Sequence, residues 1–116
     1  MKAADFGVIS TTVAQQDDAE RIAAMLLAEK LAACVQIMGI NSRYVWQGET
    51  NHEPELLLLI KTRSVLFDAV IARIAAEHPY ETPEIVATPF AAGFAGYFDW
   101  IAENTIGEVH IAEPSK

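Results

Sequence analysis

Two hydrophobic patterns alternate along this sequence of 116 residues. Runs that are rich in Val, Ile and Thr, or wholly apolar, predict strands, and apolar residues spaced three and four apart predict amphipathic helices. The predicted strands are Phe6–Val13, Cys34–Trp46, Glu55–Thr62 and Glu84–Pro89. The predicted helices are one capped by Asp17 and ending near Leu31, one capped by Ser64 and ending before Pro79, and one over Phe94–Asn104.

The order of these elements is strand, helix, strand, strand, helix, strand, and then a final helix. Right-handed crossovers fold that order into a four-stranded antiparallel sheet, with strands in the order 4-1-3-2 and two helices on one face. This is an α+β, ferredoxin-like βαββαβ sandwich with an added C-terminal helix. The unbroken apolar run Leu56–Ile60 predicts a central strand buried on both faces. Residues 1–116 have the size of one domain, and residues 107–116 are predicted as a tail or a short strand.

The second predicted strand is too long for a body of this size. At roughly 3.3 Å per residue, Cys34–Trp46 spans about 40 Å, whereas the globule expected for this length is roughly 35 Å across. The apolar phase switches at Met38–Gly39, which predicts a bulge, and Gln47–Pro54 is the predicted turn. The long hairpin and the open sheet face predict a homo-oligomer in which hairpins reach into neighbouring copies. The alternative is a bent hairpin that folds over its own domain.

The composition narrows the range of partners. The apolar fraction of 52% supports a packed globule, and no apolar run approaches the roughly 20 residues of a membrane span. A net charge of −8 and a pI of about 4.7 argue against a nucleic-acid partner, which needs clustered Lys and Arg. The acidic surface either attracts cations or only keeps the protein soluble. The single cysteine, Cys34, and the lack of a signal-peptide pattern predict the cytoplasm.

The segment His78–Glu84, which reads HPYETPE, is the most informative local motif. Its two prolines predict a stiff, extended connector, and connectors between rigid elements often carry binding groups. His78 suggests a metal or anion contact, because neutral imidazole is a common metal ligand, and Glu77 is adjacent. The alternative is a histidine that only favours the negative end of a helix. The sequence has no histidine or cysteine spacing typical of a dedicated zinc site.

A second group of residues predicts a ligand cleft between subunits. Lys61 ends the predicted central strand, where its ammonium group reaches a rim rather than the core. Thr11 and Thr12 are expected beside it at the end of the first strand. The residues predicted to line the cleft are Trp46, Lys61, Tyr80 and Glu84. The alternative for Lys61 is a solvated strand end.

Several short motifs in this sequence are those of a known family. They are Ala28–Cys34 (AEKLAAC), Ser42, Tyr44, Trp46, Gly48, Ile60–Thr62, His78–Glu84, Tyr97 and Trp100. On these motifs, which follow in order over most of the chain, the sequence resembles the CutA divalent-cation tolerance proteins. The resemblance implies a ferredoxin-like fold assembled into a homotrimer like that of PII signalling proteins. It also implies a cytoplasmic protein involved in tolerance of divalent cations, copper in particular, and no enzyme activity.

The same resemblance implies where copper is expected. In some members the ligands are a cysteine that ends the first strand and two adjacent histidines before the proline. Here those positions hold Thr11, Glu77 and His78. Only His78 keeps a good copper ligand, since thiolate and imidazole suit copper better than hydroxyl and carboxylate. The prediction is therefore weak binding, at most, of Cu²⁺ or another divalent cation, centred on His78 with a carboxylate and not obligatory.

Three classes of function compete for this sequence. The first is a trimeric binding or signalling module whose clefts hold a small ligand or a metal ion. The second is an acylphosphatase-like enzyme on the same fold, which needs an arginine in the loop after the first strand, and Ala14–Gln16 has neither arginine nor glycine. The third is an RNA-recognition module, whose third strand carries aromatic and basic residues, whereas Glu55–Thr62 carries leucines. The residues favour the first class.

Overall fold

A computed structural model of the chain describes residues 1–107, so the predicted tail or short strand after Gly107 lies outside the described residues. The strands are β1 (Phe6–Val13), β2 (Cys34–Trp46), β3 (Glu49–Arg63) and β4 (Ile85–Pro89). The helices are α1 (Gln16–Ala28), α2 (Phe67–Glu77) and α3 (Ala95–Glu103), with short 3₁₀ helices at Ala3–Asp5 and Ser64–Leu66. The predicted order of elements is confirmed.

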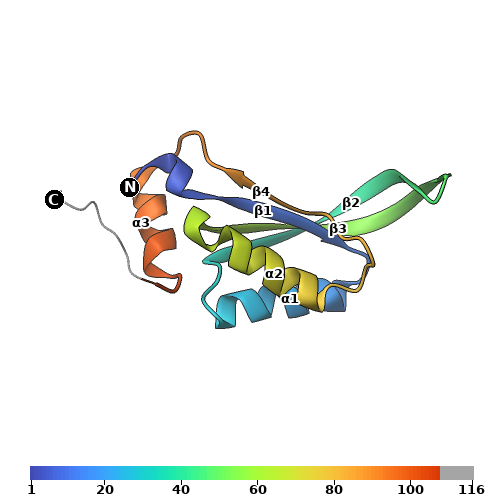
Figure 1. The fold of residues 1–116 in the computed structure, drawn as a ribbon, viewed down its shortest axis with the longest axis horizontal. Coiled ribbons are helices and arrows are strands. Elements are labelled where there is room, and N and C mark those ends of the chain that lie inside the picture. The colour runs from blue at the N-terminus through green and yellow to red at the C-terminus, as the bar shows by residue number, and fades with distance from the viewer. Residues whose placement is uncertain (108–116) are drawn as a thin grey trace.

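The strands form one antiparallel sheet in the order β2-β3-β1-β4, as predicted. Helices α1 and α2 contact each other on one face of the sheet, and α3 lies at the end opposite the hairpin tip (Figure 1). The fold is therefore the expected α+β, ferredoxin-like sandwich with an added C-terminal helix. No helix within residues 1–107 is long and apolar enough to cross a membrane.

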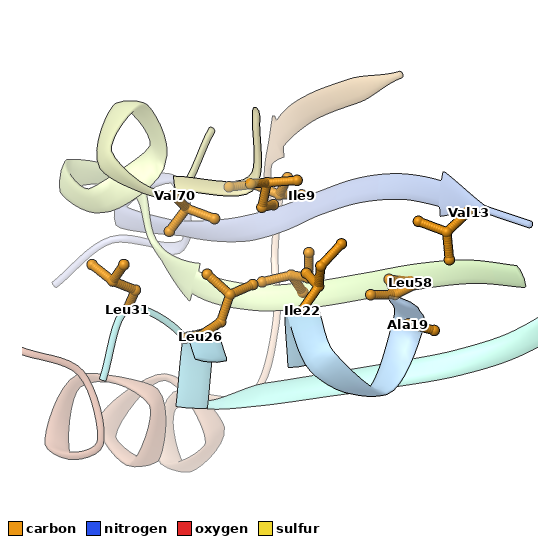
Figure 2. Close-up of a cluster of buried hydrophobic side chains, with 11 residues drawn as sticks. Ile9, Val13, Ala19, Ile22, Leu26, Leu31, Leu58 and Val70 are labelled. Carbon is orange, nitrogen blue, oxygen red and sulfur yellow. The ribbon is translucent and has the colours of Figure 1, made fainter. Parts of the chain in front are cut away.

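The main core lies between the sheet and helices α1 and α2 (Figure 2). Ile9 and Val13 of β1 point to this face together with Leu58 of β3, because alternate residues of a strand share a face. Ile22 and Leu26 of α1 pack against them, and all five side chains are fully buried. Each such side chain contributes about 1.5–3 kcal/mol through its burial. The apolar stripe of α1 is thus what attaches the helix to the sheet.

A second, smaller core attaches α3 to the opposite face of the sheet. Phe6 lies three positions before Ile9 on β1, so its side chain points away from α1 and α2. Its ring stacks on Phe98 of α3 with the ring centroids 4.9 Å apart, and Ile101 completes the cluster. Helix α3 therefore covers one end of the face that α1 and α2 leave open.

The starts of the first two helices differ from the predicted caps. Gln15 is the N-cap of α1, and Asp17 lies in the first turn, where its carboxylate favours the positive end of the helix dipole. Ser64 begins a 3₁₀ helix and donates its hydroxyl to the carbonyl of Ala4, so it does not cap α2. Asp17 and Ser64 both lie near the predicted helix starts, but neither side chain caps the helix.

The hairpin formed by β2 and β3 is regular and has no bulge. Its pairing keeps one register from Cys34 opposite Lys61 to Trp46 opposite Glu49, so the bulge predicted at Met38–Gly39 is wrong. The apolar phase switches there because only the first half of β2 packs over the core on the helix side. The phase switch that predicted a bulge therefore marks the place where β2 leaves the core, and no residue is inserted there.

A two-residue turn, Gln47–Gly48, joins the two strands, so the turn predicted over Gln47–Pro54 is wrong. The φ angles of these residues are 53° and 83°, a left-handed pair whose twist suits a tight hairpin. Strand β3 consequently starts at Glu49, and its first residues pair only with β2, because β1 opposes β3 only from Leu56 onward. Pro54 lies in this two-stranded part, where a free edge tolerates a missing N–H.

The far half of the hairpin projects from the body of the molecule. The described residues extend over 55 × 27 × 20 Å, and their radius of gyration is 15.5 Å, against roughly 13 Å expected for a chain of this length. We call residues 40–55, where β2 and β3 pair only with each other, the arm. The predicted protruding hairpin is confirmed, and the alternative of a hairpin folded over its own domain is wrong (Figure 1).

The face of the sheet opposite α1 and α2 carries apolar side chains that the described residues leave uncovered. Leu57 and Leu59 alternate with the buried Leu58 and are only half-buried, so residues 1–107 do not bury both faces of this strand. The strand register places Val86 in the row of Leu59, and Met38 in the row of Leu57. Met38 and Val86 are 49% and 52% exposed. We call Met38, Leu57, Leu59 and Val86 the open apolar face.

Candidate ligand-binding cleft

A cavity of about 870 Å³ lies where the arm leaves the body of the molecule. One wall comes from β2 and β3, and the other comes from the end of β1 and the connector between α2 and β4. Its lining includes Tyr44, Trp46, Glu53, Glu55, Tyr80 and Glu84. A concave site of this volume is in the range that holds small ligands. We refer to it as the cleft.

Glu55 is the most buried charged residue of the cleft. It is only 9% exposed, and its Oε2 accepts a hydrogen bond of 2.6 Å from the hydroxyl of Tyr80. Burial raises the pKa of Tyr80 well above its ordinary value, and the bond to the carboxylate raises it further, so the phenol stays protonated and acts as the donor. Pro79 and Pro83 keep this part of the connector extended, which limits the directions that Tyr80 can take.

A second tyrosine–glutamate pair lies on the arm. The hydroxyl of Tyr44 donates to Oε1 of Glu53 over 2.8 Å, and this bond raises the pKa of Tyr44. The register of β2 and β3 puts Tyr44 and Glu53 on the same face of the ribbon as Glu55. Two carboxylates, each held by a phenol, therefore lie on one side of the hairpin.

No ion pair within residues 1–107 neutralises the carboxylates of the cleft. The ion pairs of that part of the chain join Arg21 to Asp18 and Glu77, and Arg73 to Glu29 and Glu77. Arg43 also lines the cavity, but it alternates with Tyr44 along β2 and so points from the other face of the ribbon. Within the described part of the chain, the carboxylate of Glu55 thus has a hydroxyl partner and no cationic one.

His78 ties the connector to the end of β1. Its Nε2 lies 2.9 Å from the carbonyl oxygen of Thr12 and must donate, because a carbonyl only accepts, while its Nδ1 accepts from the backbone N–H of Tyr80 over 3.1 Å. Both ring nitrogens of the neutral imidazole are therefore satisfied. Burial lowers the pKa of His78, even though the bond to Thr12 favours the charged form. The ring positions Tyr80 for its bond to Glu55.

We expect the His78→Gln variant to lose about 1–2 kcal/mol of stability at neutral pH, because hydrogen bonds of the ring are lost. This difference should shrink as the pH falls below about 6.5, the ordinary pKa of histidine. The pKa of His78 is lowered by folding, so unfolded wild type takes up a proton that the folded protein resists, and wild type alone loses stability. Urea unfolding of both proteins from pH 8 to pH 5 measures the difference. A difference that stays constant contradicts the assignment.

The structure does not bring the three residues predicted to hold a metal together as a cluster of free donors within residues 1–107. The carboxylate of Glu77 is paired with Arg21 and Arg73, and both nitrogens of His78 are engaged. The hydroxyl of Thr11 is fully buried on the helix-facing side of β1 and has no hydrogen-bond partner among residues 1–107. Within residues 1–107 no three or more His, Cys, Asp or Glu side chains are arranged to hold a metal ion. These donors do not fit copper, and metal binding at His78 stays a prediction.

Of the four residues predicted for the ligand cleft, the structure brings together Trp46, Tyr80 and Glu84 but not Lys61. Lys61 lies opposite Cys34, at the end of β3 that is remote from the arm, and its Nζ donates to Gln36 over 2.8 Å. It is not beside Thr11, because antiparallel pairing puts the end of β1 against the start of the leucine run rather than its end. A cleft between subunits that includes Lys61 stays a prediction.

Sequence reasoning did not single out Glu53 or Glu55 as cleft residues. Glu55 has the position of a polar strand start, and only the tertiary fold brings it to Tyr80, which lies 25 residues away in sequence. One signal was present. A carboxylate directly before the apolar run of a central strand has little access to water, so it requires a polar or charged partner.

Comparisons with known proteins agree with this fold. The family described as CutA1 divalent ion tolerance protein matches residues 7–104. The divalent-cation tolerance protein CutA of Thermus thermophilus is 48% identical over 99 residues, which are 84% of this chain and 96% of that protein. The solved structure of Cut A1 from the same organism has a TM-score of 0.82 at 48% identity, covering 86% of this chain and 98% of that one.

Further relatives come from an archaeon and a plant. The solved CutA of Archaeoglobus fulgidus has a TM-score of 0.83 at 40% identity and covers 85% of this chain and 97% of that one. Protein CutA 1, chloroplastic, of Oryza sativa subsp. japonica is 40% identical over 99 residues, which are 84% of this chain but only 56% of that protein. The family match runs from β1 to the end of α3. This chain therefore belongs to the CutA1 divalent ion tolerance protein family.

Proposed function

We propose that this protein is a homotrimeric binding module in the tolerance of divalent cations, and that its cleft holds a positively charged ligand. Membership of the CutA1 family supports the biological setting. The cleft supports the binding of a positively charged ligand. It is a cavity of about 870 Å³, and the carboxylates that line it have no basic partner in the described part of the chain. A cation bound in the cleft would neutralise these carboxylates.

The environment of Glu55 is the observation that carries this proposal. Its carboxylate is nine-tenths buried and is held by one neutral hydroxyl. Removing an ionised carboxylate from water costs several kcal/mol unless an opposite charge and further hydrogen bonds replace the lost hydration. The phenol of Tyr80 offsets only part of this cost. A bound cation offsets the rest, which gives the cleft an intrinsic preference for positive charge.

The proposed assembly is supported by two features of the fold. The open apolar face exposes Met38 and Val86 by about half, and burial of such surfaces drives association. The arm presents a strand edge beyond the body, where it can pair with another copy. Three copies are proposed because the resemblance to CutA proteins implies a trimer.

The proposal assigns binding rather than catalysis to this protein. An acylphosphatase-like enzyme, the alternative on this fold, needs an arginine in the loop after β1 to hold a phosphate group. That loop consists of Ala14 and Gln15, and α1 begins at Gln16. The carboxylates of the cleft also favour positive ligands over phosphates.

The cytoplasm is kept as the proposed compartment. The support is the single cysteine, which suits a reducing environment. The names of relatives differ on this point, since the rice protein is called chloroplastic and the Archaeoglobus fulgidus protein periplasmic.

A thermal-unfolding screen tests the proposed function. Wild type, Glu55→Gln and Glu103→Gln are heated with Mg²⁺, Mn²⁺ or Cu²⁺ and, separately, with small ammonium ions. Glu103 is exposed on α3, so its replacement removes the same charge outside the cleft. We expect at least one cation to raise the Tm of wild type and Glu103→Gln but not that of Glu55→Gln. Equal shifts in all three proteins, or no shift in any, contradict the proposal.

A further inference from the structure

The lining of the cleft combines one buried carboxylate with three aromatic side chains. Glu55 supplies the carboxylate, and Tyr44, Trp46 and Tyr80 supply the aromatic surface. We infer that the cleft selects an organic ammonium ion with an apolar stem rather than a bare metal ion. This inference rests on the proposed function and names the chemical class of its ligand.

The carboxylate of Glu55 has one oxygen free for a ligand. Its Oε2 is taken by Tyr80, whereas Oε1 accepts no hydrogen bond from any of residues 1–107. Glu55 lines the cavity and is only 9% exposed, so a ligand that enters can reach this free oxygen on a largely buried side chain. An ammonium group donates up to three hydrogen bonds and carries the opposite charge, which gives a short, charge-assisted bond to this oxygen.

The arrangement of donors does not favour a bare metal ion. Divalent cations such as Mg²⁺ and Ca²⁺ take six or more oxygen ligands, and copper prefers thiolate or imidazole. In the described part of the chain no three His, Cys, Asp or Glu side chains converge on one point, and both ring nitrogens of His78 are hydrogen-bonded to the backbone. A cavity of about 870 Å³ is also far larger than a single ion requires.

The aromatic residues suit the carbon chain of an organic cation. The hydroxyls of Tyr44 and Tyr80 are already used as donors to Glu53 and Glu55, so what these residues offer a ligand is apolar ring surface. Aromatic rings attract ammonium groups and pack against methylene groups. Trp46 lies on the same face of the ribbon as Tyr44, two positions further along β2. The aromatic rings therefore form a surface that extends toward the tip of the arm, along which the carbon chain of the ligand can pack.

A second carboxylate sets the length of the preferred ligand. Glu53 and Glu55 are two positions apart on β3, so their backbone positions differ by about 7 Å on the same face. A diamine with a four-carbon chain has its two charges at a similar separation. We therefore expect 1,4-diaminobutane to bind more tightly than n-butylammonium, which has one charge.

Isothermal titration of the full chain tests the inference, with 1,4-diaminobutane, n-butylammonium, 1-butanol and Mn²⁺ as probes at one ionic strength. We expect the affinity to be highest for 1,4-diaminobutane and lower for n-butylammonium, and we expect no measurable binding of 1-butanol. Glu55→Gln should weaken diamine binding by about tenfold or more, since a charged hydrogen bond is lost. Trp46→Leu, an exposed change on the arm that spares the core, should weaken it about threefold. Glu103→Gln should leave it unchanged.

The outcomes separate this inference from the proposed function. Binding of Mn²⁺ that Glu55→Gln abolishes, without ammonium binding, overturns the inference and leaves the proposed function standing. Diamine binding that is equal in wild type, Glu55→Gln and Trp46→Leu places the diamine elsewhere and overturns the inference as well. If neither kind of cation binds, both ideas fail together.

Discussion

The Leu59→Glu variant is expected to be monomeric at micromolar concentrations at which wild type is expected to be a trimer. Leu59 lies on β3, between β2 and β1, at the centre of the open apolar face. In an assembly that buries this face, each subunit would place an unpaired carboxylate in an apolar contact, at a cost of several kcal/mol per subunit. Light scattering after size exclusion measures the mass, which is 12.7 kDa for one chain.

A matched variant controls for the added charge. Val65 is 76% exposed on the 3₁₀ helix before α2 and lies outside the open apolar face, so Val65→Glu should keep the wild-type mass. Urea unfolding of Leu59→Glu should still show a cooperative transition, because Leu59 lies outside the main core and is only partly buried within residues 1–107. A wild type that is monomeric, or a Leu59→Glu variant with the wild-type mass, would show that this face is not the contact.

The Gly7→Ala variant is expected to lose about 3 kcal/mol of stability or more, although it adds a single methyl group. A Cβ atom at Gly7 would lie 2.4 Å from the carbonyl oxygen of Thr88, 2.9 Å from Cα of Pro89 and 2.6 Å from Cζ of Phe67. Two of these atoms belong to the backbone of β4 and cannot rotate away. The methyl group therefore forces β4 away from β1 and disturbs the packing of α2 at its first residue.

Gly39→Ala is the control for the Gly7 variant. Gly39 lies in β2, and a Cβ atom there would meet nothing within 4 Å. Its replacement should change the stability by no more than about 1 kcal/mol, and in the stabilising direction, because alanine restricts the unfolded chain. Urea unfolding of both variants at one protein concentration makes the comparison, since oligomer stability depends on concentration. Similar losses in the two variants would contradict the steric account.

The strands of the body were predictable because each has a local pattern that agrees with its place in the sheet. The predicted bounds of β1 and β2 are those observed, and the run Leu56–Ile60 correctly indicated a central strand. The start of β3 was missed because Glu49–Pro54 is polar and lacks alternation. That segment is a strand because its backbone pairs with β2, and the hydrophobicity of its side chains does not indicate this pairing.

The cleft was only partly predictable for a related reason. The prolines of the connector directed attention to Tyr80 and Glu84, and the long strand directed it to Trp46. Lys61, which lies apart from them within one chain, was grouped with them because the register of β1 against β3 is not visible in either strand alone. Glu55 was missed because its partner, Tyr80, is set by how the connector crosses the end of the sheet.

The position of the cleft at the root of the arm has a thermodynamic consequence. Tyr44 and Trp46 belong to the arm, whereas Tyr80 and Glu84 belong to the connector on the body of the molecule. A contact that fixes the angle between the arm and the body therefore also fixes the width of the cleft. Docking of a neighbouring copy and occupancy of the cleft are then linked equilibria, so each must change the affinity of the other by the same factor.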